Sequence, residues 1–157
     1  MRRLARILAL WVGASLPATA LADLLPFEAD SLDTIAHARR GRPFVLVLWS
    51  IDCPPCYKEL ALLGRLRATL PPGQLVLVST DAPEQRGDIE GTLARFGLEA
   101  IDSYVFADGV PERLRQRIDP DWFGELPRSY LYRADHSRQA ISGVLDEQAL
   151  RRALGQE

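Results

Sequence analysis

Cysteine is scarce in this sequence: the 157 residues include only Cys53 and Cys56. Domains that depend on disulfides for their fold are short and rich in cysteine, so the chain does not belong to that class. A bridge between two residues so close in sequence removes little entropy from the unfolded chain and adds little stability. Chemistry is therefore the better explanation for the pair.

An excess of positive charge is also missing. Lys58 is the only lysine, and the formal net charge is −2. Residues 1–22 contain three of the 19 basic residues and none of the 21 acidic ones, so the remainder has a net charge of −5. Nucleic-acid binding requires a concentrated basic surface. The composition therefore argues against nucleic acid as a partner.

The apolar stretch near the N-terminus falls short of the roughly 20 residues that cross a bilayer. Three arginines precede this stretch at 7–16, and Pro17 and several alanines follow it. This order is typical of a secretory signal peptide, with cleavage expected after Ala22. We predict a signal peptide over 1–22, a mature domain over 23–157, and an oxidising, periplasmic location. An uncleaved membrane anchor is the alternative.

Buried strands and helices alternate along the mature chain. Apolar, β-branched runs predict strands at 43–49, 74–80 and 104–106. Helical spacing of apolar residues predicts helices at 32–39, 60–70, 88–96, 111–118 and 146–154. Two further β-type runs joined by a short polar turn predict a hairpin of 128–133 with 139–144. The sequence therefore predicts one α/β domain, with a mixed central sheet and helices on both faces.

The cysteine pair lies where a buried strand ends and a helix begins. The first turn of a helix has unpaired N–H groups and the positive end of the helix dipole, and both stabilise an anion. We therefore expect Cys53 to form the reactive thiolate, and Cys56, one turn further on, to lie deeper with a higher pKa. In this interpretation Cys53 forms a mixed disulfide with a partner and Cys56 resolves it.

A metal site is the main chemical alternative, because half of a zinc site has the same C-x-x-C spacing. Zinc needs two further ligands, and the chain offers only His37, His136 and carboxylates, with no second C-x-x-C. We interpret the two histidines as ordinary surface residues and expect neither zinc nor copper. The only redox group expected is the Cys53–Cys56 disulfide itself.

The segment WSIDCPPC at 49–56 resembles the active-site segment of thioredoxin-like proteins. With YKEL at 57–60, GELP at 124–127 and the LDEQAL segment at 145–150, it is most similar to the TlpA/ResA-like group of extracytoplasmic disulfide reductases. The resemblance implies a thioredoxin-like three-layer fold and an enzyme that exchanges disulfides with protein clients.

Four residues acquire roles from the resemblance. Pro127 matches the family's cis-proline beside the cysteine pair, where a client chain would lie against the backbone of Leu126; an ordinary trans proline is the alternative. Glu59 matches an acid that would move a proton to or from Cys56, or it is a solvent-facing acid near a helix N-terminus. Trp49 matches the tryptophan beside the active site, and is equally consistent with a plain core aromatic.

Two positions depart from the family pattern. Asp52 stands where an aromatic residue usually precedes the first cysteine, and its charge should oppose ionisation of Cys53 and raise the thiol pKa. Val47 stands where thioredoxin has a buried acid, a function that Glu59 would replace. Both differences argue against activity of the cytoplasmic thioredoxin type.

The leading interpretation is a periplasmic reductase of protein disulfides. Such a reductase has to be re-reduced by a membrane electron donor, of the DsbD/CcdA type in the family it resembles, since the compartment is oxidising. Apocytochrome c thiols are one client class that the resemblance implies. The alternatives are a non-catalytic binding protein with a permanent disulfide and a metallochaperone.

Overall fold

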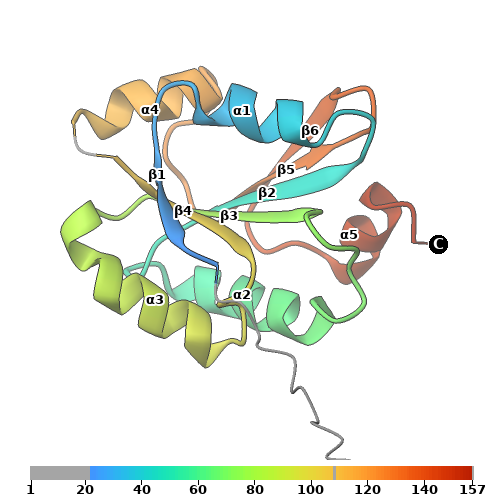
Figure 1. Cartoon of the computed structure of the whole chain (residues 1–157), viewed down its shortest axis with the longest axis horizontal. Helices are drawn as coiled ribbons and strands as arrows, with labels where there is room; N and C mark the ends of the chain where they lie inside the picture. The colour runs from blue at the N-terminus through green and yellow to red at the C-terminus, as the bar shows by residue number, and fades with distance from the viewer. Residues whose placement is uncertain (1–21, 108, 157) are drawn as a thin grey trace, which may run out of the picture.

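The computed structural model describes residues 22–107 and 109–156 (Figure 1). The predicted signal peptide therefore lies outside the described residues, apart from Ala22. Among the residues described, no helix combines the length and apolar character needed to span a bilayer.

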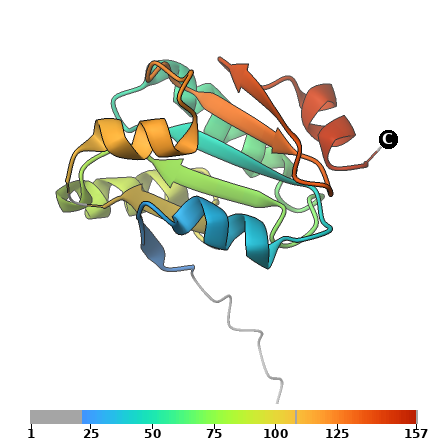
Figure 2. The ribbon, with the colours of Figure 1, turned by 90° about the horizontal axis from the view of Figure 1, so that it is seen from above.

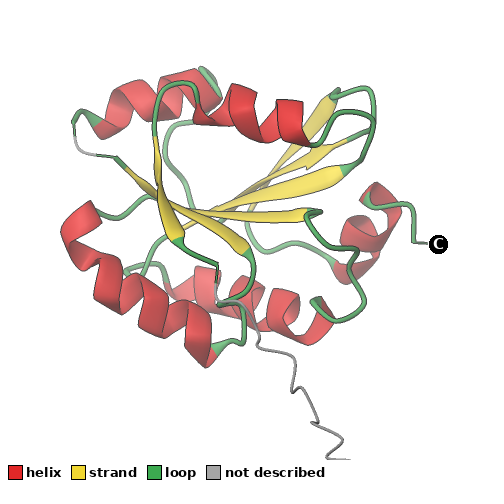
Figure 3. Cartoon of the chain, in the orientation of Figure 1, coloured by secondary structure: helices red, strands yellow, loops and turns green. Residues whose placement is uncertain are grey.

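Six strands form one mixed sheet in the order β1-β4-β3-β2-β5-β6 (Figure 3). Strands β1 to β4 are parallel, and β5 and β6 are antiparallel to their neighbours. The strands are β1 Leu24–Phe27, β2 Phe44–Trp49, β3 Leu75–Ser79, β4 Asp102–Phe106, β5 Arg128–Tyr132 and β6 Arg138–Ser142. The predicted mixed sheet with an antiparallel hairpin at one side is confirmed.

Helices cover both faces of the sheet, and the view in Figure 2 shows the strands between them. Helices α1 and α4 lie on one face, while α2, α3 and α5 lie on the other. Their bounds are α1 Ser31–Ala38, α2 Pro54–Leu66, α3 Arg86–Arg95, α4 Pro111–Ile118 and α5 Glu147–Ala153, with a short 3-10 turn at Pro83–Gln85. The arrangement is the thioredoxin-like three-layer fold that the resemblance implies.

The central strand β2 is buried over its whole length. Val45, Val47 and Trp49 join the apolar cluster under α2, α3 and α5, and the residues between them join the cluster under α1 and α4. Side chains alternate between the two faces of a strand, so an unbroken apolar run is what a doubly covered strand requires. Burial on both faces fixes the position of Trp49, where the strand ends.

Two sequence predictions differ from the structure. The first strand, β1, was missed because it has only four residues, with Pro26 among them, and such a segment is too short to show a pattern. The helix expected to reach residue 70 ends at Leu66 instead. The residue before a proline is disfavoured in helical conformation, and Leu70, which precedes Pro71, is buried in the turn that follows the helix.

Helix α2 packs closely against the end of α3, and Gly64 is the residue that permits it. A Cβ atom at Gly64 would lie 2.2 Å from the backbone oxygen of Phe96. We expect Gly64→Ala to lower the free energy of unfolding by about 1–3 kcal/mol, because the backbone has to shift. Gly91 of α3 has no atom within 4 Å of its would-be Cβ. Gly91→Ala should therefore stabilise the protein by about 0.5–1 kcal/mol.

Urea titrations of the two variants and the parent protein measure both effects. Equal changes in the two variants would show that helix propensity, and not the contact between α2 and α3, governs position 64.

Candidate functional site

The site lies at the carboxyl end of β2, where the chain turns into α2. Residues 50–52 make the turn, and Cys53 is the N-cap residue of α2. The Cys53 N–H donates to the carbonyl oxygen of Ser50 at 3.2 Å. Pro54 takes the first helical position, where its missing N–H leaves no hydrogen bond unmade. The sequence thus places the first cysteine at the start of a helix.

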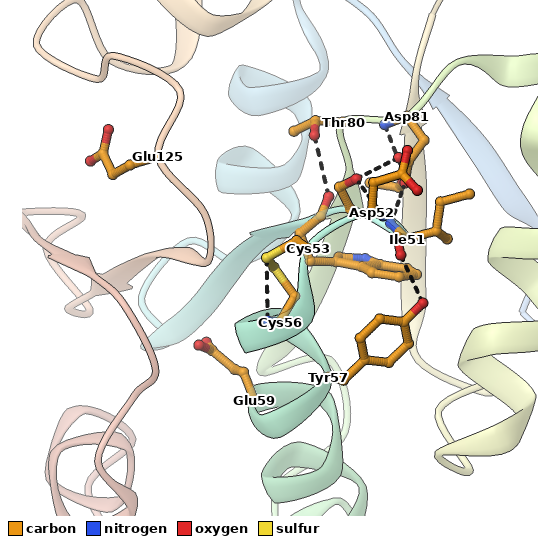
Figure 4. The surroundings of a disulfide bond; sticks show 12 residues. Ile51, Asp52, Cys53, Cys56, Tyr57, Glu59, Thr80, Asp81 and Glu125 are labelled. Atoms are coloured by element: carbon orange, nitrogen blue, oxygen red, sulfur yellow. Dashed lines mark hydrogen bonds between the residues drawn. A yellow bond between two sulfur atoms is a disulfide. The ribbon is translucent and has the colours of Figure 1, made fainter.

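Cys53 and Cys56 form a disulfide, with their Cα atoms 5.3 Å apart (Figure 4). Cys53 is 8% exposed, whereas Cys56 is fully buried. The Cys56 N–H donates to the Cys53 sulfur at 3.2 Å. The prediction that Cys56 lies deeper is confirmed, and the Cys53 sulfur accepts a hydrogen bond from the first turn of the helix.

Two side chains hold the turn at 50–52 from opposite sides. The Asp81 carboxylate, just beyond the end of β3, accepts hydrogen bonds from the Ser50 hydroxyl at 2.6 Å and the Ile51 N–H at 3.0 Å. The Tyr57 hydroxyl on α2 donates to the Ile51 carbonyl at 2.8 Å. Figure 4 shows both groups beside the turn. Neither residue has a role that the sequence pattern predicts.

The Glu59 side chain is buried, with 1% exposure, so the interpretation of Glu59 as a solvent-facing acid is wrong. Its carboxyl accepts hydrogen bonds from the Ser129 hydroxyl on β5 at 2.8 Å and from the Leu145 N–H at 3.3 Å. Burial raises the pKa of the Glu59 carboxyl, and these two hydrogen bonds offset part of the rise. Residues three apart on a helix share a face, so Glu59 follows Cys56 on the same side of α2.

The buried carboxyl of Glu59 lies close to the strand position where thioredoxin has its acid. Val47 of β2 pairs in register with Ser129 of β5, and Ser129 is the residue that donates to Glu59. A carboxyl from the helix therefore reaches the same region of the sheet that Val47 leaves apolar.

The Leu126–Pro127 peptide bond is cis, as the resemblance implies. Leu48 pairs with Arg128 in antiparallel register. Leu126 and Pro127, which precede Arg128, therefore lie beside the end of β2, where the turn to the cysteines begins. Leu126 is partly buried and packs against the cluster that contains both cysteines. Trp49 is 1% exposed within that same cluster. It is a core residue next to the site, and its role toward a client stays a prediction.

The loop before Pro127 is joined to Arg128 by ion pairs and exposes one aromatic side chain. Arg128 pairs with Asp119 and Glu125, each at 2.9 Å. Phe123, which lies between Asp119 and Glu125 in the sequence, is 95% exposed. A side chain this apolar and this exposed is a surface feature that apolar periodicity does not reveal, because it belongs to no helix or strand.

The remaining predicted features are less central. Asp52 is exposed, and its N–H donates to the Ser50 hydroxyl oxygen at 3.1 Å. His37 is exposed on α1, while His136 is half-buried and packs edge-on against Phe44, at the end of β2 remote from the cysteines. Over 22–107 and 109–156 no three His, Cys, Asp or Glu residues are grouped as metal ligands would be.

No model of a protein family matches the chain, and no curated protein matches it. Solved structures do match. A secreted disulfide oxidoreductase of Mycobacterium tuberculosis, homologous to DsbE of E. coli, is 22% identical, with a TM-score of 0.58 over 76% of this chain and 84% of that one. A thiol:disulfide interchange protein of the thioredoxin family from Chlorobium tepidum is 18% identical, with a TM-score of 0.60 over 76% and 82%.

StoA of Bacillus subtilis is 19% identical, with a TM-score of 0.51 over 73% of this chain and 83% of that one. At such low identity these structures establish the fold, which is thioredoxin-like.

The raised pKa of Glu59 predicts how stability depends on pH. Below the ordinary carboxyl pKa the group is protonated in both states, and its burial carries no charge penalty. As pH rises, the unfolded chain ionises first, so the protein loses stability relative to Glu59→Gln until the pH passes the raised value. The loss is about 1.4 kcal/mol for each unit by which the pKa of Glu59 in the folded protein exceeds its pKa in the unfolded chain.

Denaturant titrations of the parent and of Glu59→Gln across this pH range measure the difference. Glu125→Gln is the control of opposite sign. Burial works against ionisation of Glu125, but hydrogen bonds from Ser142 and the backbone and the charge of Arg128 together lower its pKa. The parent should therefore gain stability over Glu125→Gln as pH rises. Parallel curves for the parent and Glu59→Gln would contradict the raised pKa.

Proposed function

We propose that the protein is a thiol–disulfide oxidoreductase that reduces disulfides of protein clients. One observation carries the proposal: at the N-terminus of α2, Cys53 of the disulfide-bonded pair keeps 8% of its surface exposed, whereas Cys56 is fully buried. The outer sulfur already accepts the Cys56 N–H, a hydrogen bond that strengthens when the sulfur becomes an anion. A disulfide with a purely structural role has no use for this asymmetry.

The reaction follows from the geometry. In the reduced protein the Cys53 thiolate attacks one sulfur of the client disulfide, and the other client sulfur leaves as a thiolate that takes up a proton. Cys56 then loses its proton and attacks the Cys53 sulfur, which breaks the mixed disulfide and releases the second client thiolate. Two electrons pass from the dithiol to the client, and the Cys53–Cys56 disulfide forms again.

The Glu59 carboxyl is the group we assign to the proton of Cys56. It is the buried acid one turn along α2 on the same face, and its raised pKa brings it closer to that of a thiol. Figure 4 shows Glu59 directly beyond the disulfide along the helix. No charged group hydrogen-bonds to its carboxyl among the contacts described, since its donors are the Ser129 hydroxyl and the Leu145 N–H.

The client segment would lie beside Leu126 and Pro127, next to the end of β2, with the exposed ring of Phe123 at the margin of the same loop. The absence of an N–H on Pro127 leaves its side of the backbone open to an incoming chain. Trp49 would support the turn and the cysteine pair by packing against them in the core.

The proposed location is the periplasm. It rests on the signal-peptide pattern at 1–22 and on the fold shared with a protein described as secreted. In that oxidising compartment the reductase would draw its electrons from a membrane donor of the DsbD/CcdA type, and apocytochrome c thiols remain one client class.

Substitution of each cysteine tests the assignment of roles. Cys53→Ser should abolish reduction of insulin disulfides, since no thiolate remains to attack. Cys56→Ser should accumulate a mixed disulfide with the client, because no thiol remains to resolve it. Non-reducing electrophoresis and mass spectrometry after acid quenching detect the trapped species.

Faster alkylation of Cys56 than of Cys53 in the reduced protein would reverse the roles. A native disulfide that resists dithiothreitol would favour the non-catalytic binding protein. A reduction potential well above about −150 mV, closer to that of strong oxidants, would favour an oxidase over a reductase.

Glu59→Gln should slow the resolution step on the order of 10²-fold, the usual range for loss of a positioned acid–base group. The Ser129 hydroxyl can accept from the new amide as readily as it donates to the carboxyl, so the fold should persist. Stopped-flow measurement of mixed-disulfide decay separates this step from the initial attack. Glu90→Gln, an exposed change on α3, should leave both steps unchanged, and unaltered decay in Glu59→Gln would leave Glu59 a purely structural residue.

A further inference from the structure

The turn that carries Cys53 is built around the side chain of Asp81. The Asp81 carboxylate is 8% exposed and accepts from three donors: the Ser50 hydroxyl at 2.6 Å, the Ile51 N–H at 3.0 Å and the Ser79 hydroxyl at 2.6 Å. The Asp81 N–H in turn donates to the Ser79 hydroxyl oxygen at 3.1 Å. One buried carboxylate therefore joins the end of β3 to the turn that follows β2.

The connection continues along the chain to the reactive sulfur. The Ser50 hydroxyl oxygen, already bonded to Asp81, accepts the Asp52 N–H at 3.1 Å, and the Ser50 carbonyl accepts the Cys53 N–H at 3.2 Å. Asp81 thus fixes Ser50, and Ser50 fixes the two residues that lead into α2. Figure 4 shows Asp81 beside Ile51 and Asp52 of this turn.

The hydrogen bonds that join Asp81 to the turn at 50–52 matter most when the disulfide is reduced. In the oxidised protein the S–S bond itself holds the Cys53 sulfur against Cys56. Once that bond is broken, the sulfur stays over the first turn of α2 only if the backbone on its N-terminal side is held. A thiolate that drifts from this place loses the Cys56 N–H that stabilises it.

We infer that Asp81 is a positioning residue for the redox pair: through Ser50 and Ile51 it holds the Cys53 thiolate at the N-terminus of α2 in the reduced protein. The inference deepens the proposed function. Asp81 touches neither sulfur in the bonds described, and acts through the turn at 50–52.

Two substitutions at position 81 separate geometry from charge. Asp81→Ala removes the acceptor of the Ser50 hydroxyl and of the Ile51 N–H. Asp81→Asn removes the charge but keeps a carbonyl oxygen that accepts from the Ile51 N–H. Its amide N–H can donate to the Ser50 hydroxyl oxygen. If position governs, alkylation of Cys53 near neutral pH should slow about tenfold or more in Asp81→Ala, the worth of one hydrogen bond to a charged group, and should stay close to the parent in Asp81→Asn.

The measurement is the pH profile of iodoacetamide alkylation of reduced protein, with thermal unfolding followed by circular dichroism to establish that each variant is folded. Ser50→Ala, a smaller change that leaves every charge in place, should shift the profile in the same direction as Asp81→Ala and carries the test if that variant does not fold. Asp135→Ala is the matched control. Asp135 accepts from Ser137 in the turn between β5 and β6, remote from the cysteines.

A simple charge effect would make both position-81 variants react faster and alike, because loss of a negative charge favours a nearby thiolate, and Ser50→Ala would not change. That outcome, or an unchanged profile in folded Asp81→Ala and Ser50→Ala, overturns the inference. Alkylation requires no client. A profile that depends on Asp81 in a protein that reduces no client disulfide would support the inference and contradict the proposed function.

Discussion

The hydrogen bond from the Cys56 N–H to the Cys53 sulfur is the interaction on which the proposed chemistry depends. It exists because β2 ends at Trp49 and α2 begins at Pro54, so that the first cysteine falls on the N-cap position. The two layers of helices fix β2 from both faces, and the strand in turn fixes where the sulfur lies. In the proposed function, the fold thus supports one sulfur atom whose negative charge has to be stabilised.

Burial sets Cys56 and Glu59 apart from Cys53, which is slightly exposed. Cys56 and Glu59 are both closed to solvent, so in the proposed mechanism a proton exchanged between them is not lost to water. The same burial opposes ionisation of Glu59, so a carboxyl that costs stability at neutral pH is retained at this place in the core. Its position beside Ser129, the register partner of Val47, gives a physical reason why the strand itself carries no acid.

The sequence was sufficient for the parts of the structure that repeat a local pattern. The run at 44–49 predicts a doubly buried strand, and the cysteine pair after it predicts a helix N-terminus. The segment 24–27 has too few residues to show alternation, and β1 was missed for that reason. The burial of Glu59 was not predictable either, since its donors are 70 and 86 residues away along the chain.

Asp81 is an intermediate case. It follows β3 as residues 50–52 follow β2, and the carboxyl ends of neighbouring parallel strands lie together, so its proximity to the turn was available from the sequence. What the sequence could not supply is the direction of the side chain, which depends on the local path of both loops. The exposure of Phe123 is similar, because it depends on the path of a loop that belongs to no helix or strand.

The single lysine gives the molecule one chemical handle on the helix that begins with the cysteine pair. Lys58 is exposed on α2, two residues after Cys56, and no other side chain in the sequence carries a primary amine. Amine-directed fluorophores or crosslinkers will therefore attach there, or at the chain's N-terminus, without any engineered residue. A dye attached to Lys58 would therefore report on α2, the helix that begins with the cysteine pair.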